Sequence, residues 1–173
     1  MNKKLNIWNI LLFSITLFYI YFLISQILFK YVTLVGLFEQ GRYFSQSINM
    51  IPFNDLFKGV YNQLDVFGNI ILFIPFGLIV KIYKPSLKFK NSFILFFIVS
   101  FSFEAFQYIF AIGASDVTDI IYNVFGGILG MGIYKILKFI FKKEDTANKI
   151  IIVMGSVMLI IVSTLLILIS IYN

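Results

Sequence analysis

Residues 102–130 read SFEAFQYIFAIGASDVTDIIYNVFGGILG, and the most informative pattern of the chain lies in them. Two apolar segments meet here, joined by a short connection. Glu104 and Gln107 are three residues apart on the first segment, so on a helix they share one face. Residues at steps of three and four on the second segment form one helical stripe: Asp116, Asp119, Asn123, Gly126 and Gly130. Ionisable residues inside membrane-length segments cost roughly 2.5 kcal/mol or more each, so this stretch is the candidate functional site.

The composition is that of an integral membrane protein. The chain has 173 residues, of which 60% are hydrophobic and only 13% are charged. It has no cysteine and no histidine, which excludes disulfides, thiol chemistry and the commonest general base. The net charge of +6 comes from basic residues set between apolar segments, which favours membrane topology and anionic lipid over nucleic acid as its explanation.

Five apolar segments are long enough to cross a membrane, and they predict an all-α, polytopic transmembrane helix bundle. We expect one domain over residues 1–173. The first segment is expected to be an uncleaved helix, because it is too long for a signal peptide and no small-residue cleavage site follows it. The predicted spans are about 5–29, 66–83, 92–112, 117–140 and 150–171.

The connection between the first two spans, residues 30–65, is the only long one. Its scattered apolar residues predict a partly interfacial external loop. Near its end, Asn49 begins the sequence NMIPF, in which Pro52 restrains the backbone and predicts a fixed bend. Two interpretations of this bend stay open: a turn that dips into the lipid headgroups, or a segment that lines a pocket.

Basic residues are distributed unevenly between the two sides of a five-span chain. Eleven fall on the side of the amino terminus and three, Lys30, Arg42 and Lys58, on the other side. The positive-inside rule therefore places the amino terminus in the cytoplasm and the carboxyl terminus outside the cell membrane. In this orientation the polar residues of the second, third and fourth spans converge in the outer half of the membrane, namely Asp65 and Asn69, Glu104 and Gln107, and Asp116, Asp119 and Asn123.

Each polar residue also has a structural interpretation. Asp116 or Ser115 could cap the fourth helix, and Asp119 would favour the positive end of its dipole. Asn69 could cap the second span, which is the favoured interpretation, or point inward. Gln107 and Asn123 could be hydrogen-bond links between helices. The glycines of the fourth helix predict a packing surface formed by Gly126, Gly127, Gly130 and Gly132.

Four ordered motifs resemble those of the VanZ-like family. They are NxIPF at residues 49–53, NIILFIPFG at 69–77, ExxQ at 104–107 and DxxDxxxNxxGG at 116–127. The resemblance covers residues 49–132 and leaves the first and fifth spans without a signature. Many members carry a basic residue just before the first aspartate of the last motif, where this chain has Gly113, Ala114 and Ser115. Arg42 or Lys58 from the long loop could substitute for it.

The resemblance implies a small bacterial envelope protein, associated in its named relative with resistance to the lipoglycopeptide teicoplanin in Gram-positive hosts. The partner it implies is a membrane lipid, a lipid-linked envelope precursor or the drug itself. The residues expected to bind it are Asn49, Asn69, Glu104, Gln107, Asp116, Asp119 and Asn123. No cofactor and no metal site are assigned, although carboxylates would suit Mg²⁺ or Ca²⁺.

Three functions compete. The first is a binding or shielding protein that holds an envelope lipid or the drug. The second is a membrane enzyme acting on a lipid-linked substrate, with Glu104 and Asp119 as candidates for the catalytic acid and base. The third is a proton-coupled carrier, which the lack of an internal repeat disfavours.

The charge distribution makes a direct prediction about topology. A single cysteine at Ala114 should react with an impermeant thiol reagent in intact cells, and one at Ser86 should be protected until the membrane is opened. The native chain provides a background without thiols. The opposite labelling pattern would reverse the orientation.

Overall fold

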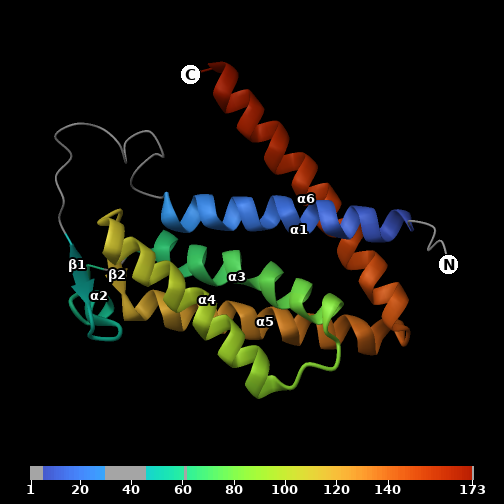
Figure 1. The fold of residues 1–173 in the computed structure, drawn as a ribbon, viewed down its shortest axis with the longest axis horizontal. Coiled ribbons are helices and arrows are strands. Elements are labelled where there is room, and N and C mark those ends of the chain that lie inside the picture. Colours follow the sequence, from blue (N-terminus) through green and yellow to red (C-terminus); the bar gives the residue numbers. More distant parts are fainter. Residues whose placement is uncertain (1–5, 30–45, 61, 173) are drawn as a thin grey trace. The chain divides into compact units, whose positions relative to one another are not determined.

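The computed structural model describes residues 6–29, 46–60 and 62–172 (Figure 1). The elements in this part are α1 (Ile7–Leu28), β1 (Ser47–Asn49), α2 (Asn54–Phe57), α3 (Gln63–Tyr83), α4 (Phe89–Phe110), β2 (Ala114–Asp116), α5 (Val117–Phe141) and α6 (Glu144–Tyr172). Five of the helices, α1 and α3–α6, are long and apolar enough to cross a membrane. The predicted all-α, multi-pass membrane bundle is thereby confirmed.

The largest difference from the predicted spans is at the start of α6. Residues 142–149 were expected to be a charged loop, but α6 begins at Glu144 and only Lys142 and Lys143 connect it to α5. Two features of the sequence explain the longer helix. Acidic residues at an amino-terminal turn favour the helix dipole, and Asp145 pairs with Lys149 four residues later at 2.6 Å.

The helices α3 and α4 also begin earlier than predicted. Because α3 starts at Gln63, Asn69 lies in its second turn, so the interpretation of Asn69 as the helix cap is wrong. The start of α4 at Phe89 is three residues before the predicted one. Its end comes at Phe110, since Ala111 takes the left-handed conformation with φ 48°.

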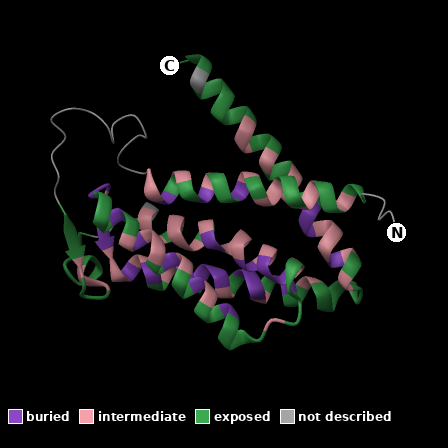
Figure 2. Cartoon of the chain, in the orientation of Figure 1, coloured by how far each residue is buried: buried purple, intermediate pink, exposed green. Residues whose placement is uncertain are grey.

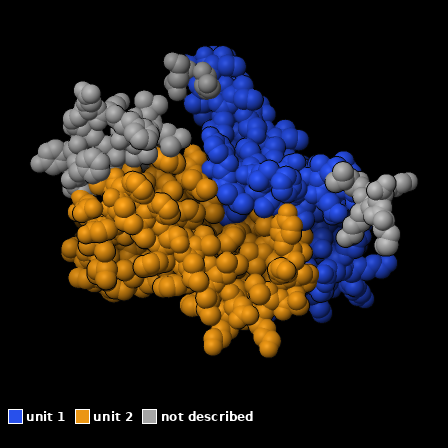
Figure 3. All heavy atoms as spheres, viewed as in Figure 1, with its two compact units in different colours: residues 1–22, 134–173 blue, residues 23–133 orange. Residues whose placement is uncertain are grey.

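The chain divides into two compact units, coloured separately in Figure 3. One consists of residues 23–133 and the other of residues 1–22 and 134–173. The expectation of a single domain stays a prediction. The prediction of an interfacial loop over residues 30–65 also stays a prediction, and its part over residues 30–45, with Lys30 and Arg42, lies outside the described residues.

Aromatic side chains form the centre of the unit of residues 23–133. Phe73 of α3 and Phe96 of α4 are fully buried. The ring of Phe76 packs edge-on against both, with centroid distances of 5.8 Å to Phe73 and 5.4 Å to Phe96. Figure 2 shows the buried positions concentrated along α4 and α5 of this unit, while many other helix surfaces are exposed. Exposed apolar faces of this kind suit a lipid environment.

Glycines allow α3 and α5 to approach until their backbones touch. A Cβ atom at Gly126 would overlap the carbonyl oxygen of Ile70, and one at Gly130 would overlap that of Ile74. At Gly127 a Cβ atom would lie 2.6 Å from the Phe96 ring. The predicted packing surface is therefore confirmed for these three glycines. It is wrong for Gly132, where a Cβ atom would meet nothing within 4 Å.

The second unit contains the start of α1, the end of α5 and all of α6. Tyr134 and Ala147 are buried within it. Lys138 forms an ion pair with Glu144, and the Lys149 Nζ lies 5.5 Å from the centroid of the Trp8 ring. From residue 153 onward α6 is mostly exposed.

The two kinds of glycine on α5 give a matched pair for testing the close helix crossing. Gly126→Ala should lower the free energy of unfolding by about 1–3 kcal/mol, because the added methyl group meets backbone that cannot move aside. Gly132→Ala should leave stability unchanged or raise it by about 0.5–1 kcal/mol, since alanine is the better helix former. Unfolding in mixed micelles measures both. Equal stability of the two variants would contradict the crossing.

Candidate functional site

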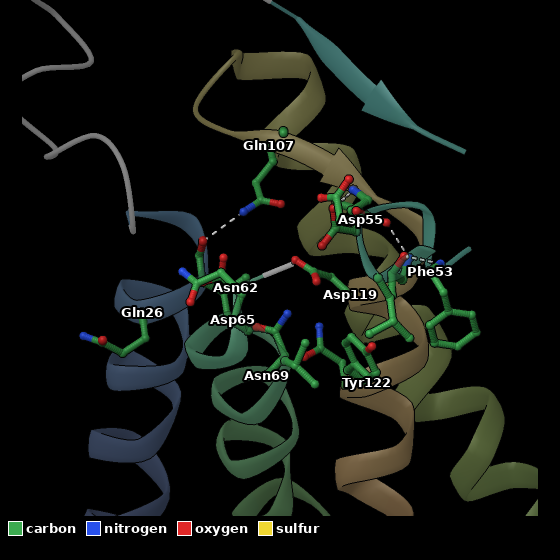
Figure 4. Close-up of a pocket in the computed structure, with 17 residues that line it drawn as sticks. Gln26, Phe53, Asp55, Asn62, Asp65, Asn69, Gln107, Asp119 and Tyr122 are labelled. Carbon is green, nitrogen blue, oxygen red and sulfur yellow. Dashed lines mark hydrogen bonds between the residues drawn. The ribbon is translucent and has the colours of Figure 1, made fainter. Parts of the chain in front are cut away.

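A cavity of about 180 Å³ lies at the end of unit 23–133 where β1, β2 and α2 are gathered (Figures 1 and 4). Figure 4 shows Asn69, Gln107 and Asp119 reaching it from α3, α4 and α5. The deepest lining residues are Glu104, Gln107 and Asn123, each at most 6% exposed. The full lining is Gln26, Ile27, Phe53, Asp55, Leu56, Asn62, Asp65, Val66, Asn69, Glu104, Gln107, Ala114, Asp116, Thr118, Asp119, Tyr122 and Asn123.

A short parallel strand pair lies beside this pocket, and its strand β2 contributes Ala114 and Asp116 to the lining. β1 aligns Asn49 with Asp116 of β2. The Asn49 Nδ2 also donates a hydrogen bond to Asp116 Oδ2 at 3.0 Å. Its Oδ1 accepts from the Ile51 N–H at 3.3 Å, which bends the chain away from the strand. Asn49 is therefore not a lining residue but holds one in place.

Asp116 and Glu104 are joined through the backbone. The Asp116 N–H donates to Glu104 Oε2 at 2.8 Å. The Asp116 Oδ1 in turn accepts from the Thr118 N–H at 2.7 Å, directly before α5 begins at Val117. Asp116 is thus the amino-terminal cap of α5, as one interpretation of the sequence predicted. The same carboxylate binds Asn49 with its other oxygen, so both of its oxygens serve the fold.

The NMIPF bend is fixed against α5. The Asn54 N–H donates to the Ile51 carbonyl at 3.3 Å, which closes a turn with Pro52 in its second position. Phe53 takes the left-handed conformation with φ 59°, a strained one for a phenylalanine. Its N–H donates to Thr118 Oγ1 at 3.0 Å, and its ring packs edge-on against Tyr122. Of the two interpretations left open, the pocket-lining one agrees with this geometry, because Phe53, Asp55 and Leu56 all line the cavity.

Three amides in the wall each have an unpartnered atom. Gln107 donates through Nε2 to the Ile27 carbonyl at 2.9 Å, but its Oε1 accepts from no atom of the described chain. Asn123 donates through Nδ2 to Ser100 Oγ at 2.9 Å, and its Oδ1 is likewise unpartnered. Asn69 Nδ2 is the third such atom. Buried polar atoms without a partner are unusual and destabilising in proteins, so these three mark the pocket as a binding site candidate.

The wall is rich in acidic groups. Five of its residues are acidic, namely Asp55, Asp65, Glu104, Asp116 and Asp119. Asp116 and Asp119 both interact electrostatically with Glu104. No lysine or arginine lies among the described lining residues. Lys58, one of the two basic residues considered as a counter-ion, is exposed at the carboxyl end of α2, and Arg42 lies outside the described residues.

The arrangement offers acceptors and acid and base groups rather than a preformed metal centre. Within residues 6–29, 46–60 and 62–172, no three acidic residues are gathered as metal ligands. Glu104 uses Oε2 for the Asp116 N–H. The buried polar atoms of the wall that lack a partner in the described chain are Gln107 Oε1, Asn123 Oδ1 and Asn69 Nδ2.

Six of the seven residues predicted to bind a ligand lie on the pocket wall, and Asn49 is bonded to one of them. Their role as ligand-binding residues stays a prediction. Sequence reasoning did not identify Gln26, Asp55, Asn62, Thr118 and Tyr122 as wall residues. Thr118 and Tyr122 could have been found, because they lie next to the Asp116, Asp119 and Asn123 stripe on one helix. Gln26 and Asn62 carry no such signal.

Comparisons of the sequence with known proteins found two matches. A family model described as VanZ/LLP1 matches residues 10–138, which includes most of α1 and every lining residue of the pocket. Protein VanZ of Enterococcus faecium is 33% identical over 143 residues, covering 83% of this chain and 84% of that protein. No solved structure matches the chain. The matched range begins well before residue 49, where the first motif was found.

The bond between Phe53 and Thr118 makes a prediction about the NMIPF bend. Thr118→Val keeps the shape of the side chain but leaves the Phe53 N–H without its acceptor, so it should cost about 1–3 kcal/mol of stability. It should also speed hydrogen exchange in residues 50–57. Thr118→Ser, which keeps the hydroxyl, is the matched control. Wild-type exchange in Thr118→Val would show that this bond does not fix the bend.

Proposed function

The chain belongs to the VanZ/LLP1 family, as the four motifs predicted, and from this premise we propose a function in resistance to lipoglycopeptides. In the proposal it is a multi-pass protein of the cell membrane of a Gram-positive bacterium. It confers low-level resistance to drugs such as teicoplanin by binding or modifying an envelope lipid, or the drug, in the outer half of the membrane. Its amino terminus is cytoplasmic and its carboxyl terminus extracellular.

One observation carries the proposal. Polar residues from elements far apart in the sequence line one cavity: Asn69 from α3, Glu104 and Gln107 from α4, and Asp119 and Asn123 from α5. Membrane helices have little reason to bury so many polar groups at one level unless the groups serve a function. The proposed orientation places this cavity on the outer side, where an envelope precursor and a glycopeptide meet.

An enzyme acting on a lipid-linked substrate is the second candidate. Glu104 and Asp119 both line the cavity and interact electrostatically, so they form a pair from which an acid and a base could be drawn. A binding protein leaves its lipid unchanged and an enzyme does not. Mass spectrometry of lipid-linked precursors from cells with and without the protein separates the two functions.

Isosteric changes of the two acids test the proposed site. Glu104→Gln and Asp119→Asn keep the shape of each side chain, and the amide oxygen introduced at position 104 can still accept the Asp116 N–H. Both variants should fold to near-normal levels and yet lower the teicoplanin inhibitory concentration of a sensitive Gram-positive host to that of the empty vector. Each value is normalised to the amount of protein in the membrane.

Asp145→Asn is the matched control, since it removes an exposed carboxylate whose ion pair with Lys149 lies outside the pocket. This variant should retain full resistance. Full resistance from both pocket variants would refute the proposed site. A host in which the parent chain confers no resistance would refute the proposed link to teicoplanin.

A further inference from the structure

Three buried amide atoms of the pocket wall lack a partner in the described chain, and they come from three different helices. Gln107 Oε1 of α4 and Asn123 Oδ1 of α5 are acceptors, and Asn69 Nδ2 of α3 is a donor. The nitrogen of Gln107 already donates to the Ile27 carbonyl. The nitrogen of Asn123 already donates to Ser100 Oγ. The wall therefore leaves two acceptors and one donor for a bound molecule.

The acidic groups of the wall are largely engaged within the protein. Both oxygens of Asp116 accept hydrogen bonds, and Glu104 Oε2 accepts from the Asp116 N–H. Asp65 and Asp119 also interact with other groups of the chain. No lysine or arginine lies among the described lining residues to pair with an anion. An unpaired charge is costly to bury, so these contacts favour an uncharged ligand.

We propose that the pocket binds two neighbouring hydroxyl groups of an uncharged sugar or polyol headgroup. One hydroxyl donates to Gln107 Oε1 and the other to Asn123 Oδ1, and a hydroxyl oxygen accepts from Asn69 Nδ2. A hydroxyl is both a donor and an acceptor, so two of them meet all three amide atoms. This inference rests on the proposed function, because it names the chemical group that the site recognises.

Other uncharged groups match the three amides less well. An ester has only acceptors and would leave Gln107 Oε1 and Asn123 Oδ1 without a donor. A secondary amide has a single N–H for these two acceptors. A primary amide has two N–H donors, but both are on one nitrogen atom, whereas the acceptors belong to separate helices. The hydroxyls of a sugar ring are on different carbon atoms, so they can reach separate helices.

The rest of the lining also suits a hydroxylated ring. Phe53 and Tyr122, labelled in Figure 4, add aromatic surface against which the C–H groups of a ring can pack. The cavity volume of about 180 Å³ is several times the roughly 30 Å³ that a water molecule occupies in the liquid. Five lining residues carry side-chain amides, which donate and accept as hydroxyls do, namely Gln26, Asn62, Asn69, Gln107 and Asn123.

The test uses the purified full-length chain in a polyoxyethylene detergent, because a maltoside detergent would itself compete for a sugar site. Four octyl glycosides are compared. Octyl glucoside carries the free hydroxyls, and its per-O-methyl derivative keeps the ring and its oxygens but has no O–H donor. Octyl glucosaminide replaces one hydroxyl by an ammonium, and octyl glucuronide carries a carboxylate. The rise of the melting temperature with the mole fraction of each probe in the micelle gives an apparent Kd.

Octyl glucoside should bind with an apparent Kd about tenfold lower than its per-O-methyl derivative, because loss of the O–H donors leaves buried acceptors unpaired. Neither charged probe should bind more tightly than octyl glucoside. Equal binding of the glucoside and its per-O-methyl derivative would show that water alone satisfies the amides, and would overturn the proposal. Tighter binding of the glucosaminide or the glucuronide would overturn the assignment of an uncharged ligand.

Asn69→Leu separates binding from folding. The Asn69 Nδ2 bonds no residue of the described chain, so the variant should keep the melting temperature of the ligand-free wild type. It should bind octyl glucoside about tenfold more weakly. Asn148→Leu is the matched control, because Asn148 of α6 also has an unpartnered amide atom but is not a lining residue. This control should keep wild-type affinity, and wild-type affinity in Asn69→Leu would contradict the proposed arrangement.

Teicoplanin, a lipoglycopeptide with sugar hydroxyls of its own, is then added as a competitor to identify the source of the hydroxyl groups. Displacement of octyl glucoside would show that the drug reaches the same site, and no displacement would assign the site to a lipid-linked sugar or polyol. Failure of the hydroxyl proposal in the glycoside series leaves the proposed function standing. The proposed function fails separately, through full resistance of the Glu104 and Asp119 variants.

Discussion

The hydrogen bond from the Asp116 N–H to Glu104 Oε2 holds one end of this structure together. A carboxylate buried in a membrane helix needs a partner, and here the partner is backbone from the next segment. That contact fixes β2 on α4. β2 then pairs with β1 through Asn49, and Asp116 caps α5. One buried acid thus fixes the position of the strand pair and of the start of α5.

The close approach of α3 and α5 at the glycines sets the width of the pocket. Gly126 of α5 packs directly against the carbonyl of Ile70 on α3. Asn123 lies one turn before Gly126, and Asn69 is the neighbour of Ile70, so the close approach brings both amides to the same level of the bundle. Larger residues at the crossing would push α3 and α5 apart and widen the floor of the cavity. The packing of α3 against α5 at the glycines therefore sets the spacing of the polar side chains in the pocket.

Most of the fold and part of the candidate site could be predicted from the sequence, for physical reasons. Apolar length alone identified five spans, and steps of three and four placed Glu104 with Gln107 and Asp116 with Asp119 and Asn123. The helical start at Glu144 was missed because its charged residues were treated as loop, although acids at a first turn stabilise a helix. Asn69 was taken for a cap because the span was expected to begin at about residue 66, whereas α3 begins three residues earlier, at Gln63. The strand pairing and the acceptor role of Thr118 were not predictable, since they depend on contacts between residues more than sixty positions apart.

The polar residues in and beside the pocket fall into two groups. In one group the side-chain polar atoms are already hydrogen-bonded within the protein, and in the other only some of them are. Asn49 and Asp116 have both side-chain polar atoms engaged, so their loss would disturb the fold before it disturbed any ligand. Gln107 and Asn123 use only their nitrogens, and their oxygens lie in the wall without a donor from the described chain. Folding alone gives no reason to bury such an acceptor, since an apolar side chain of the same size would be less costly in that place. The half-satisfied amides, rather than the conspicuous aspartates, are therefore the residues expected to determine the specificity of the proposed site.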